Sequence, residues 1–293
     1  MAPLTIPLND GTTIPWLAFG TGTALYNKEA KKEVLVAINA GIHHLDGAQV
    51  YGNEASIGDA IAESGLPRSD FYVTTKLAQI PQGKTVKDTV VESLRKLKLE
   101  YVDQFLIHTP KYHTNLKAVW REVEGLKKEG LAKTIGVSNF QVKHLEEIIH
   151  AAEIIPAINQ LEYHPYVFKA TEPVIQYQKR FNIVTTSFGG LSPITRFAGG
   201  PIDAVLEKIG KQLGDERGKP VTSGQVLQLW LRKKNIPAIS TSRKVERLQE
   251  YLDVETLRDL SPQEEKEIDD VGSKVHHRVF HQAKWIDEES AKF

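Results

Sequence analysis

The sequence predicts a (β/α)8 barrel, in which eight parallel strands close into a ring and each strand is followed by a helix. Short apolar runs alternate with amphipathic stretches along nearly all of the 293 residues. Successive strands begin about 24 to 31 residues apart until the last one. This alternation implies right-handed crossovers and a parallel sheet, and eight units favour a closed barrel. An open sheet of eight strands has the same periodicity, so it remains the alternative.

Each expected strand is a short run that is apolar enough to be buried on both faces. The strands are expected at residues 16–19, 43–46, 71–76, 102–107, 133–137, 157–160, 183–187 and 237–240. The helices are expected at residues 28–40, 54–64, 84–97, 116–129, 142–151, 171–179, 223–233 and 244–252. Gly41, Gly65 and Gly130 stand at or just beyond helix ends, where glycine is favoured as a C-cap.

Further segments add to the eight units. Residues 5–14 predict an N-terminal β-hairpin with its turn at 9–11. The long gap before the last strand contains a loop, 188–201, and an extra amphipathic stretch, 202–213. A capped helix begins at Ser261, and an irregular tail follows from 275 to 293. Because no low-complexity linker interrupts the chain, residues 1–293 are expected to form a single domain.

The composition excludes several classes of protein. Lys+Arg and Asp+Glu number 37 each, which gives a formal net charge of zero and argues against nucleic-acid binding. The absence of cysteine excludes a disulfide scaffold, a zinc ribbon and a catalytic thiol. Residues 1–16 do not resemble a signal peptide, and no run approaches the roughly 20 apolar residues of a membrane helix. His277 and His281 have helical ligand spacing but no neighbouring glutamate, so no metal site is expected. The prediction is a soluble, cytoplasmic protein.

Polar residues gather where the predicted strands end, which is the functional face of such a barrel. They are Thr21, Asp46, Lys76, His108, Ser138, Asn139, Gln160, Ser240, Thr241 and Ser242, with Tyr51 in the loop after Asp46. Asp, Lys, Tyr and His together suit proton transfer, because an ammonium lowers the pKa of a nearby phenol and a carboxylate keeps the lysine charged. Each also has a structural interpretation: Lys76 and Asp46 as an ion pair, His108 as a core histidine and Tyr51 as a loop anchor.

Five segments resemble the signatures of the aldo-keto reductases. They are DGAQVYGNE (46–54), TKL (75–77), LIHTP (106–110), GVSNF (136–140) and QLEYHP (160–165). Their order and spacing are those of the family, and the resemblance runs from the hairpin to the tail. It implies a (β/α)8 barrel that carries out NADPH-dependent reduction of a carbonyl to an alcohol. It also implies a C-terminal loop that folds over the substrate.

The resemblance assigns catalytic roles to four residues. Tyr51 is expected to be the general acid that protonates the carbonyl oxygen. Lys76, paired with Asp46, is expected to lower the pKa of Tyr51 towards neutral pH. His108 is expected to orient and polarise the substrate carbonyl. A non-catalytic, NADPH-binding regulatory barrel, like the potassium-channel β subunits of this superfamily, is the alternative.

The same resemblance implies the cofactor contacts. Ser138, Asn139 and Gln160 would hold the nicotinamide carboxamide, and Phe188 would stack on the ring. Gly189, Leu191 and Ser192 would lie along the pyrophosphate. Further contacts are implied at Thr21, Gly22, Thr23 and Asp46 and, around the 2′-phosphate, at Ser240, Thr241, Ser242, Arg243, Arg247 and Glu250. Thr241 replaces the usual phosphate-binding lysine, so we expect NADPH to be preferred over NADH by a reduced margin.

The substrate pocket is expected to include Val50, Tyr51, His108 and Trp285, although Trp285 is equally compatible with surface packing. The motifs Gly-Thr-Gly-Thr (20–23) and Ser-Thr-Ser (240–242) are most similar to a fungal branch that reduces conjugated polyketones, α-keto amides and keto esters. The expected partner is therefore a small-molecule carbonyl substrate. A monomer or a weak homodimer is expected.

Overall fold

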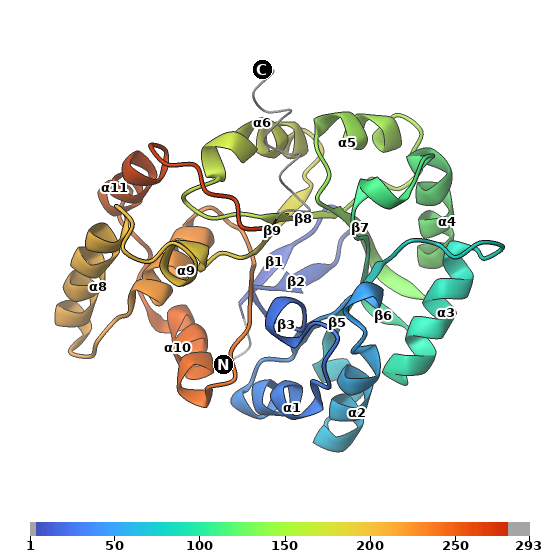
Figure 1. The fold of residues 1–293 in the computed structure, drawn as a ribbon, viewed down its shortest axis with the longest axis horizontal. Coiled ribbons are helices and arrows are strands. Elements are labelled where there is room, and N and C mark those ends of the chain that lie inside the picture. Colours follow the sequence, from blue (N-terminus) through green and yellow to red (C-terminus); the bar gives the residue numbers. More distant parts are fainter. Residues whose placement is uncertain (1–3, 281–293) are drawn as a thin grey trace.

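The computed structural model describes residues 4–280, and within them eight parallel strands close into a barrel (Figure 1). The strand order around the ring is β10-β3-β4-β5-β6-β7-β8-β9. The closing contact joins β10 to β3, with Ala238 opposite Leu17 and Ser240 opposite Phe19. This parallel pairing excludes the open sheet and confirms the predicted barrel.

Every barrel strand starts within one residue of its expected start. The strands are β3 (Leu17–Gly20), β4 (His44–Asp46), β5 (Tyr72–Leu77), β6 (Val102–Ile107), β7 (Ala132–Ser138), β8 (Ile158–Glu162), β9 (Val184–Phe188) and β10 (Ala238–Ser240). Most of their residues are buried, as expected for strands covered by helices outside and by packed side chains inside.

The helices surround the barrel (Figure 1). Those after successive strands are α1 (Lys31–Ala40), α2 (Glu54–Ser64), α3 (Val86–Leu97), α4 (Leu116–Lys128), α5 (Val142–Ile149), α6 (Phe168–Lys179), α9 (Ser223–Lys233) and α10 (Val245–Asp253). Gly41 and Gly65 adopt the left-handed C-cap conformation that the sequence predicts. The extra helices α8 (Asp203–Arg217) and α11 (Pro262–Gly272) pack beside α9. Ser261 and Glu264 form the capping box that starts α11.

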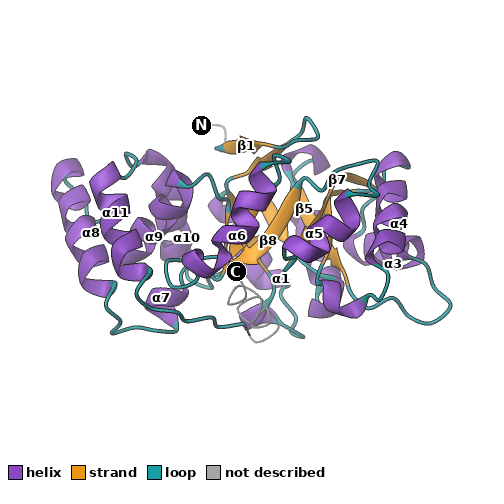
Figure 2. Ribbon diagram, turned by 90° about the horizontal axis from the view of Figure 1, so that it is seen from above, coloured by secondary structure: helices purple, strands orange, loops and turns teal. Residues whose placement is uncertain are grey.

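The N-terminal hairpin closes the bottom of the barrel. Its strands are β1 (Thr5–Pro7) and β2 (Thr13–Pro15), and Gly11 in the turn has φ +83°, where a side chain would be strained. Asp10 receives hydrogen bonds from Lys127 on α4 (2.5 Å) and Thr134 on β7 (3.0 Å). Figure 2 shows β1 at one end of the barrel and the short helix α7 (Ser192–Thr195) at the other. The carboxyl ends of the strands, at the opposite end from the hairpin, are therefore available to form a binding site.

Among residues 4–280, no helix has the length and apolar character that crossing a membrane requires. The same residues contain no group of three or more His, Asp or Glu side chains that could hold a metal ion.

Candidate active site

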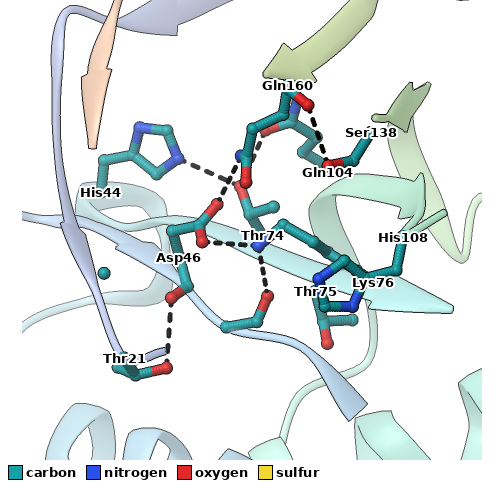
Figure 3. Close-up of polar contacts among 12 residues, drawn as sticks. Thr21, His44, Asp46, Thr74, Thr75, Lys76, Gln104, His108, Ser138 and Gln160 are labelled. Carbon is teal, nitrogen blue, oxygen red and sulfur yellow. Dashed lines mark hydrogen bonds and ion pairs between the residues drawn. The ribbon is translucent and has the colours of Figure 1, made fainter. Parts of the chain in front are cut away.

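A buried ion pair lies at the carboxyl end of β4 and β5 (Figure 3). The Nζ of Lys76 donates to Asp46 Oδ1 at 2.5 Å and to the backbone oxygen of Gly47 at 2.9 Å. The other carboxylate oxygen of Asp46 accepts from Gln160 Nε2 at 2.9 Å. Both charged side chains are almost fully buried. A buried pair of this kind persists only when its partners are well placed, and here each charge has several.

The interior layer beneath this pair is polar, and its side chains are joined by hydrogen bonds. His44 contacts Thr74 at 3.0 Å, and Thr74 donates to Gln104 at 2.8 Å (Figure 3). His44 and Asp46 lie two residues apart on β4, so both side chains point into the barrel. The polar residues inside the barrel therefore continue from this layer to the ion pair.

Tyr51 and His108 lie against the ion pair. Tyr51 ends a short 3-10 turn (Gln49–Tyr51), and Lys76 Nζ is 5.2 Å from its ring centroid. The rings of Tyr51 and His108 meet edge to face, with centroids 5.4 Å apart. A Cβ on Gly22 would lie 3.0 Å from Tyr51 Cζ, so the Tyr51 ring packs closely against this glycine. The four residues that the sequence selected therefore form one cluster.

The pKa of Tyr51 corrects one expectation. Burial raises the pKa of this phenol, and although the charge of Lys76 opposes the rise, the pKa remains above its usual value. For Lys76, burial alone would lower the pKa, but Asp46 and Tyr51 raise it above its usual value. Lys76 is thus charged and Tyr51 protonated at neutral pH. The expected net lowering of the Tyr51 pKa is wrong for the protein alone, because burial outweighs the lysine.

His108 is held neutral by its surroundings. Burial, and then the positive charge of Lys76, lower the pKa of His108 to about 3. Its Nδ1 is buried without a hydrogen-bond partner among the described residues. The ring is therefore a neutral imidazole throughout the physiological pH range.

This neutral histidine makes folding sensitive to acid. The unfolded chain binds a proton at His108 near pH 6.5, whereas the folded chain does so only near pH 3. The free energy of unfolding should therefore fall as the pH drops from 6.5 towards 3, and His108→Gln should weaken that dependence. Urea unfolding at a series of pH values measures this; an unchanged slope in the variant would contradict the assignment.

A cavity of about 760 Å³ opens above the cluster and extends along the carboxyl ends of the strands. It is large enough for a cofactor-sized ligand. Sixteen of the residues predicted as site residues line it: Gly22, Thr23, Asp46, Val50, Tyr51, His108, Ser138, Asn139, Gln160, Phe188, Gly189, Leu191, Ser192, Ser240, Thr241 and Arg247. Thr21 and Lys76 lie beneath it, fully buried. Trp285 lies outside the described residues.

One wall of the cavity has a hydrogen-bonding site that suits an amide group. Asn139 follows β7 with φ +60° and donates to His108 O and Ser138 Oγ, at 3.0 and 3.1 Å. Its own Oδ1 is buried without a partner among the described residues, although Asn139 lines the cavity. Ser138 Oγ donates to the backbone oxygen of Gln160 at 2.9 Å. An unsatisfied acceptor at this position fits an amide N–H of a ligand, such as a carboxamide.

The far end of the cavity differs from the expected phosphate site. Thr241 Oγ1 donates to Gly20 O at 2.7 Å, so its one hydroxyl proton is already used. Ser240 accepts from Gln228 Nε2 at 3.3 Å, which leaves its hydroxyl proton available. Arg247 lines the cavity, and no ion pair is found for it within residues 4–280.

Three residues expected at the phosphate do not line the cavity: Ser242, Arg243 and Glu250. Arg243 turns instead towards Glu33 on α1, at 3.7 Å, and Ala24 O, at 3.4 Å. Ser242 is buried and contacts Lys244. For these three residues, the contact with the cofactor stays a prediction. Arg247 is therefore the predicted cation that faces the cavity.

A comparison with models of protein families shows the family to which the chain belongs. Residues 16–194 match the model of the aldo/keto reductase family. The chain belongs to the aldo/keto reductase family. The NAD/NADP-dependent indole-3-acetaldehyde reductase of Schizosaccharomyces pombe is 33% identical over 281 residues, which cover 92% of this chain and 96% of that protein. The NADPH-dependent alpha-keto amide reductase of Saccharomyces cerevisiae is 28% identical, with coverage of 90% and 89%.

A solved structure supports the same conclusion. The aldo/keto reductase of Brucella melitensis is 30% identical and has a TM-score of 0.80, with coverage of 92% of this chain and 100% of that chain. The family resemblance read from the sequence motifs is thus confirmed, and so is its barrel fold.

Several residues of this aldo/keto reductase site were not predicted. They are Gly20, Ala24, Tyr26, Gly190, Thr195, Arg196, Ile239, Tyr251, Val279 and Phe280, all of which line the cavity. Tyr26 lies 6.1 Å from the Tyr51 ring, and its exposed fraction of 42% is unusual for a large aromatic residue. Tyr26 could have been predicted as a site residue, because it lies in the loop that follows a barrel strand. Val279 and Phe280 lie in a tail without periodicity, so the sequence gave no reason to choose them over their neighbours.

Proposed function

We propose that this aldo/keto reductase transfers a hydride from NADPH to a ketone or aldehyde carbonyl, with Tyr51 as general acid. The observation that carries the proposal is the cluster at the cavity floor. Tyr51 lies close to both Lys76 of the buried Lys76–Asp46 pair and His108, and Tyr51, Asp46 and His108 line the same cavity. This is a proton donor with a neighbouring cation and a neutral hydrogen-bond donor at a site of ligand size.

Tyr51 would give its proton to the carbonyl oxygen as the carbon is reduced. The raised pKa keeps the phenol protonated before reaction, which is the form that a general acid needs. After transfer, the phenolate would be stabilised by the ammonium of Lys76, whose Nζ is 5.2 Å from the ring centroid. Asp46 holds that ammonium charged and in place. The lysine therefore acts on the developing phenolate rather than on the resting phenol.

His108 would orient the carbonyl. Because its pKa of about 3 keeps the ring neutral, it carries a single N–H that can donate a hydrogen bond to the substrate oxygen. A charged imidazolium beside Lys76 would compete with Tyr51 as the acid. A neutral ring leaves the proton transfer to Tyr51 and restricts the orientation of the carbonyl.

The residues of the cavity fit a nicotinamide cofactor, which when bound supplies the hydride. Asn139 Oδ1 would accept from the carboxamide, with Ser138 and Gln160 beside it. Phe188 offers an aromatic face on the same cavity. Arg247 supplies positive charge at the other end, where the 2′-phosphate would lie. These residues support NADPH as the cofactor, and their contacts would determine which face of the nicotinamide ring is presented to the substrate.

The proposed substrates are α-dicarbonyls, conjugated polyketones, α-keto amides or keto esters. Gly22, Thr23 and Ala24 are small residues that line the cavity, so this part of its wall leaves room for a bulky carbonyl substrate. The similarity to the Saccharomyces cerevisiae alpha-keto amide reductase supports this class of substrate. A panel of carbonyls scored by NADPH consumption tests it. Activity limited to simple aliphatic aldehydes would contradict this substrate class while leaving the reductase assignment intact.

Replacing Thr241 by lysine should strengthen the preference for NADPH. The threonine proton is donated to Gly20 O, so position 241 contributes little to a phosphate, whereas a lysine there would add a cation. We expect Thr241→Lys to tighten NADPH binding roughly tenfold relative to NADH. Binding of the two cofactors by fluorescence titration measures this. Thr241→Met, of similar length but uncharged, is the control, and equal discrimination in both variants would place the 2′-phosphate elsewhere.

A further inference from the structure

The segment after α11 crosses the open end of the barrel and completes one wall of the cavity. In Figure 1 it runs from α11 towards β8 and β9. Val279 and Phe280, at its end, line the cavity. The Phe280 ring meets Phe188 edge to face, with centroids 5.0 Å apart. A Cβ on Gly189 would lie 2.9 Å from Phe280 Cε2, so the ring packs directly against that glycine.

Glu162, the last residue of β8, holds this segment from below. Its Oε1 accepts from the backbone N–H of Val279 at 2.7 Å, and its Oε2 accepts from that of Phe280 at 3.2 Å. Arg278 Nη1 lies 3.7 Å from Oε2, with both side chains almost fully buried. Backbone amides bound by a carboxylate form charge-assisted hydrogen bonds, which are stronger than neutral ones.

His164 fixes the carboxylate in turn. Its Nδ1 accepts from the backbone N–H of Tyr166 at 3.3 Å, so the ring proton of the neutral histidine lies on Nε2. That nitrogen donates to Glu162 Oε1 at 3.1 Å. Burial keeps the pKa of His164 below its usual value, in agreement with a neutral ring. Glu162 therefore has partners on both oxygens and little freedom to rotate.

We infer that Glu162 is a positioning residue, which latches residues 278–280 onto the barrel and so places Phe280 as a wall of the substrate pocket. Glu162 does not line the cavity and has no exposed side-chain surface, so it acts through the backbone it binds. This inference depends on the proposed function only in the predicted effect of the latch on turnover. Its effect on the chain itself can be measured without any substrate.

Glu162→Gln should disturb the latch without changing the size of the side chain. One of the two acceptors becomes an N–H donor facing a backbone N–H, and Arg278 loses its carboxylate. We expect kcat/KM for a carbonyl substrate to fall roughly tenfold, mainly through KM, because the pocket wall is displaced. Phe280→Ala should give a similar loss. In the double variant the loss should be no larger than in either single variant, because both act on one wall.

Asp103→Asn is the matched control. Asp103 also accepts a backbone N–H, that of Val73 at 2.9 Å, and pairs with Arg68 at 2.6 Å, but it lies near the start of β6, away from the cavity. Asp103→Asn should lower the free energy of unfolding without raising the KM for the carbonyl substrate. A KM for Glu162→Gln equal to that of the wild type, or full additivity with Phe280→Ala, would overturn the proposal.

Trypsin provides a readout that does not depend on catalysis. Because the Arg278 side chain is buried against Glu162, the wild-type chain should resist cleavage after Arg278. Glu162→Gln should be cleaved there several times faster, and Asp103→Asn should not, as judged by the mass of the chain ending at residue 278. Equal cleavage of the wild type and Glu162→Gln would contradict the latch. Absence of turnover in the wild type with a normal cleavage pattern would instead contradict the proposed function.

Discussion

Tyr51→Phe should abolish carbonyl reduction while leaving NADPH binding nearly intact. The substitution removes only the phenolic oxygen, and the ring that packs against His108 and Lys76 remains. Loss of a general acid lowers turnover by roughly 10²–10⁴-fold. The measurement is kcat under saturating substrate, together with NADPH affinity by fluorescence titration. The expected combination is a large loss in kcat and a nearly unchanged affinity.

A matched control separates the lost hydroxyl from a general disturbance of the fold. Tyr112 follows β6, is partly exposed and does not line the cavity. Tyr112→Phe likewise removes one phenolic oxygen, and this variant should keep the wild-type kcat. If Tyr51→Phe also kept wild-type kcat, another group would have to deliver the proton.

Asp46→Asn should give the second large effect, on folding as well as on activity. The substitution leaves the buried ammonium of Lys76 without its counter-charge at 2.5 Å. Removing one partner of a buried ion pair destabilises a protein by about 3–5 kcal/mol. The phenolate formed at Tyr51 would also lose its stabilising cation if Lys76 became neutral. Chemical denaturation measures the free energy of unfolding, and kcat is measured under conditions in which the variant is folded.

The double variant Asp46→Asn/Lys76→Met separates these two effects. With both charges removed, no buried charge is left unpaired, so the double variant should be more stable than Asp46→Asn alone. It should nevertheless remain inactive, because Tyr51 then has no neighbouring cation. Recovery of activity together with stability would show that the ion pair is only structural, which is the interpretation that the sequence had left open.

The barrel could be read from the sequence because each strand is a short apolar run between two amphipathic stretches. Asp46, Lys76 and His108 could be found in the same way, since each stands at or just after the carboxyl end of a strand. The convergence of these positions in space follows from the closed ring. Periodicity therefore predicted both the scaffold and the cluster that it carries.

Other features depend on packing that has no local pattern. The pKa of Tyr51 lies above its usual value because burial outweighs Lys76, and the extent of burial cannot be read from spacing. Arg243 lies 3.7 Å from Glu33 on α1, a contact that the position of Arg243 in the sequence does not reveal. The role of Phe280 depends on Glu162, which the sequence showed only as part of a family motif. Each of these requires the position of a second residue that is remote in the chain.

The most direct test of the proposed reaction is to count NADPH consumed against alcohol formed from one α-diketone at neutral pH, in wild-type and Tyr51→Phe protein. The mechanism predicts one alcohol for each NADPH oxidised by the wild type, and consumption that is at least roughly a hundredfold slower in the variant. Tight binding of NADPH by the wild type without consumption on adding diketones, keto esters or aldehydes would contradict it. That result would indicate a barrel that binds the cofactor without using its hydride.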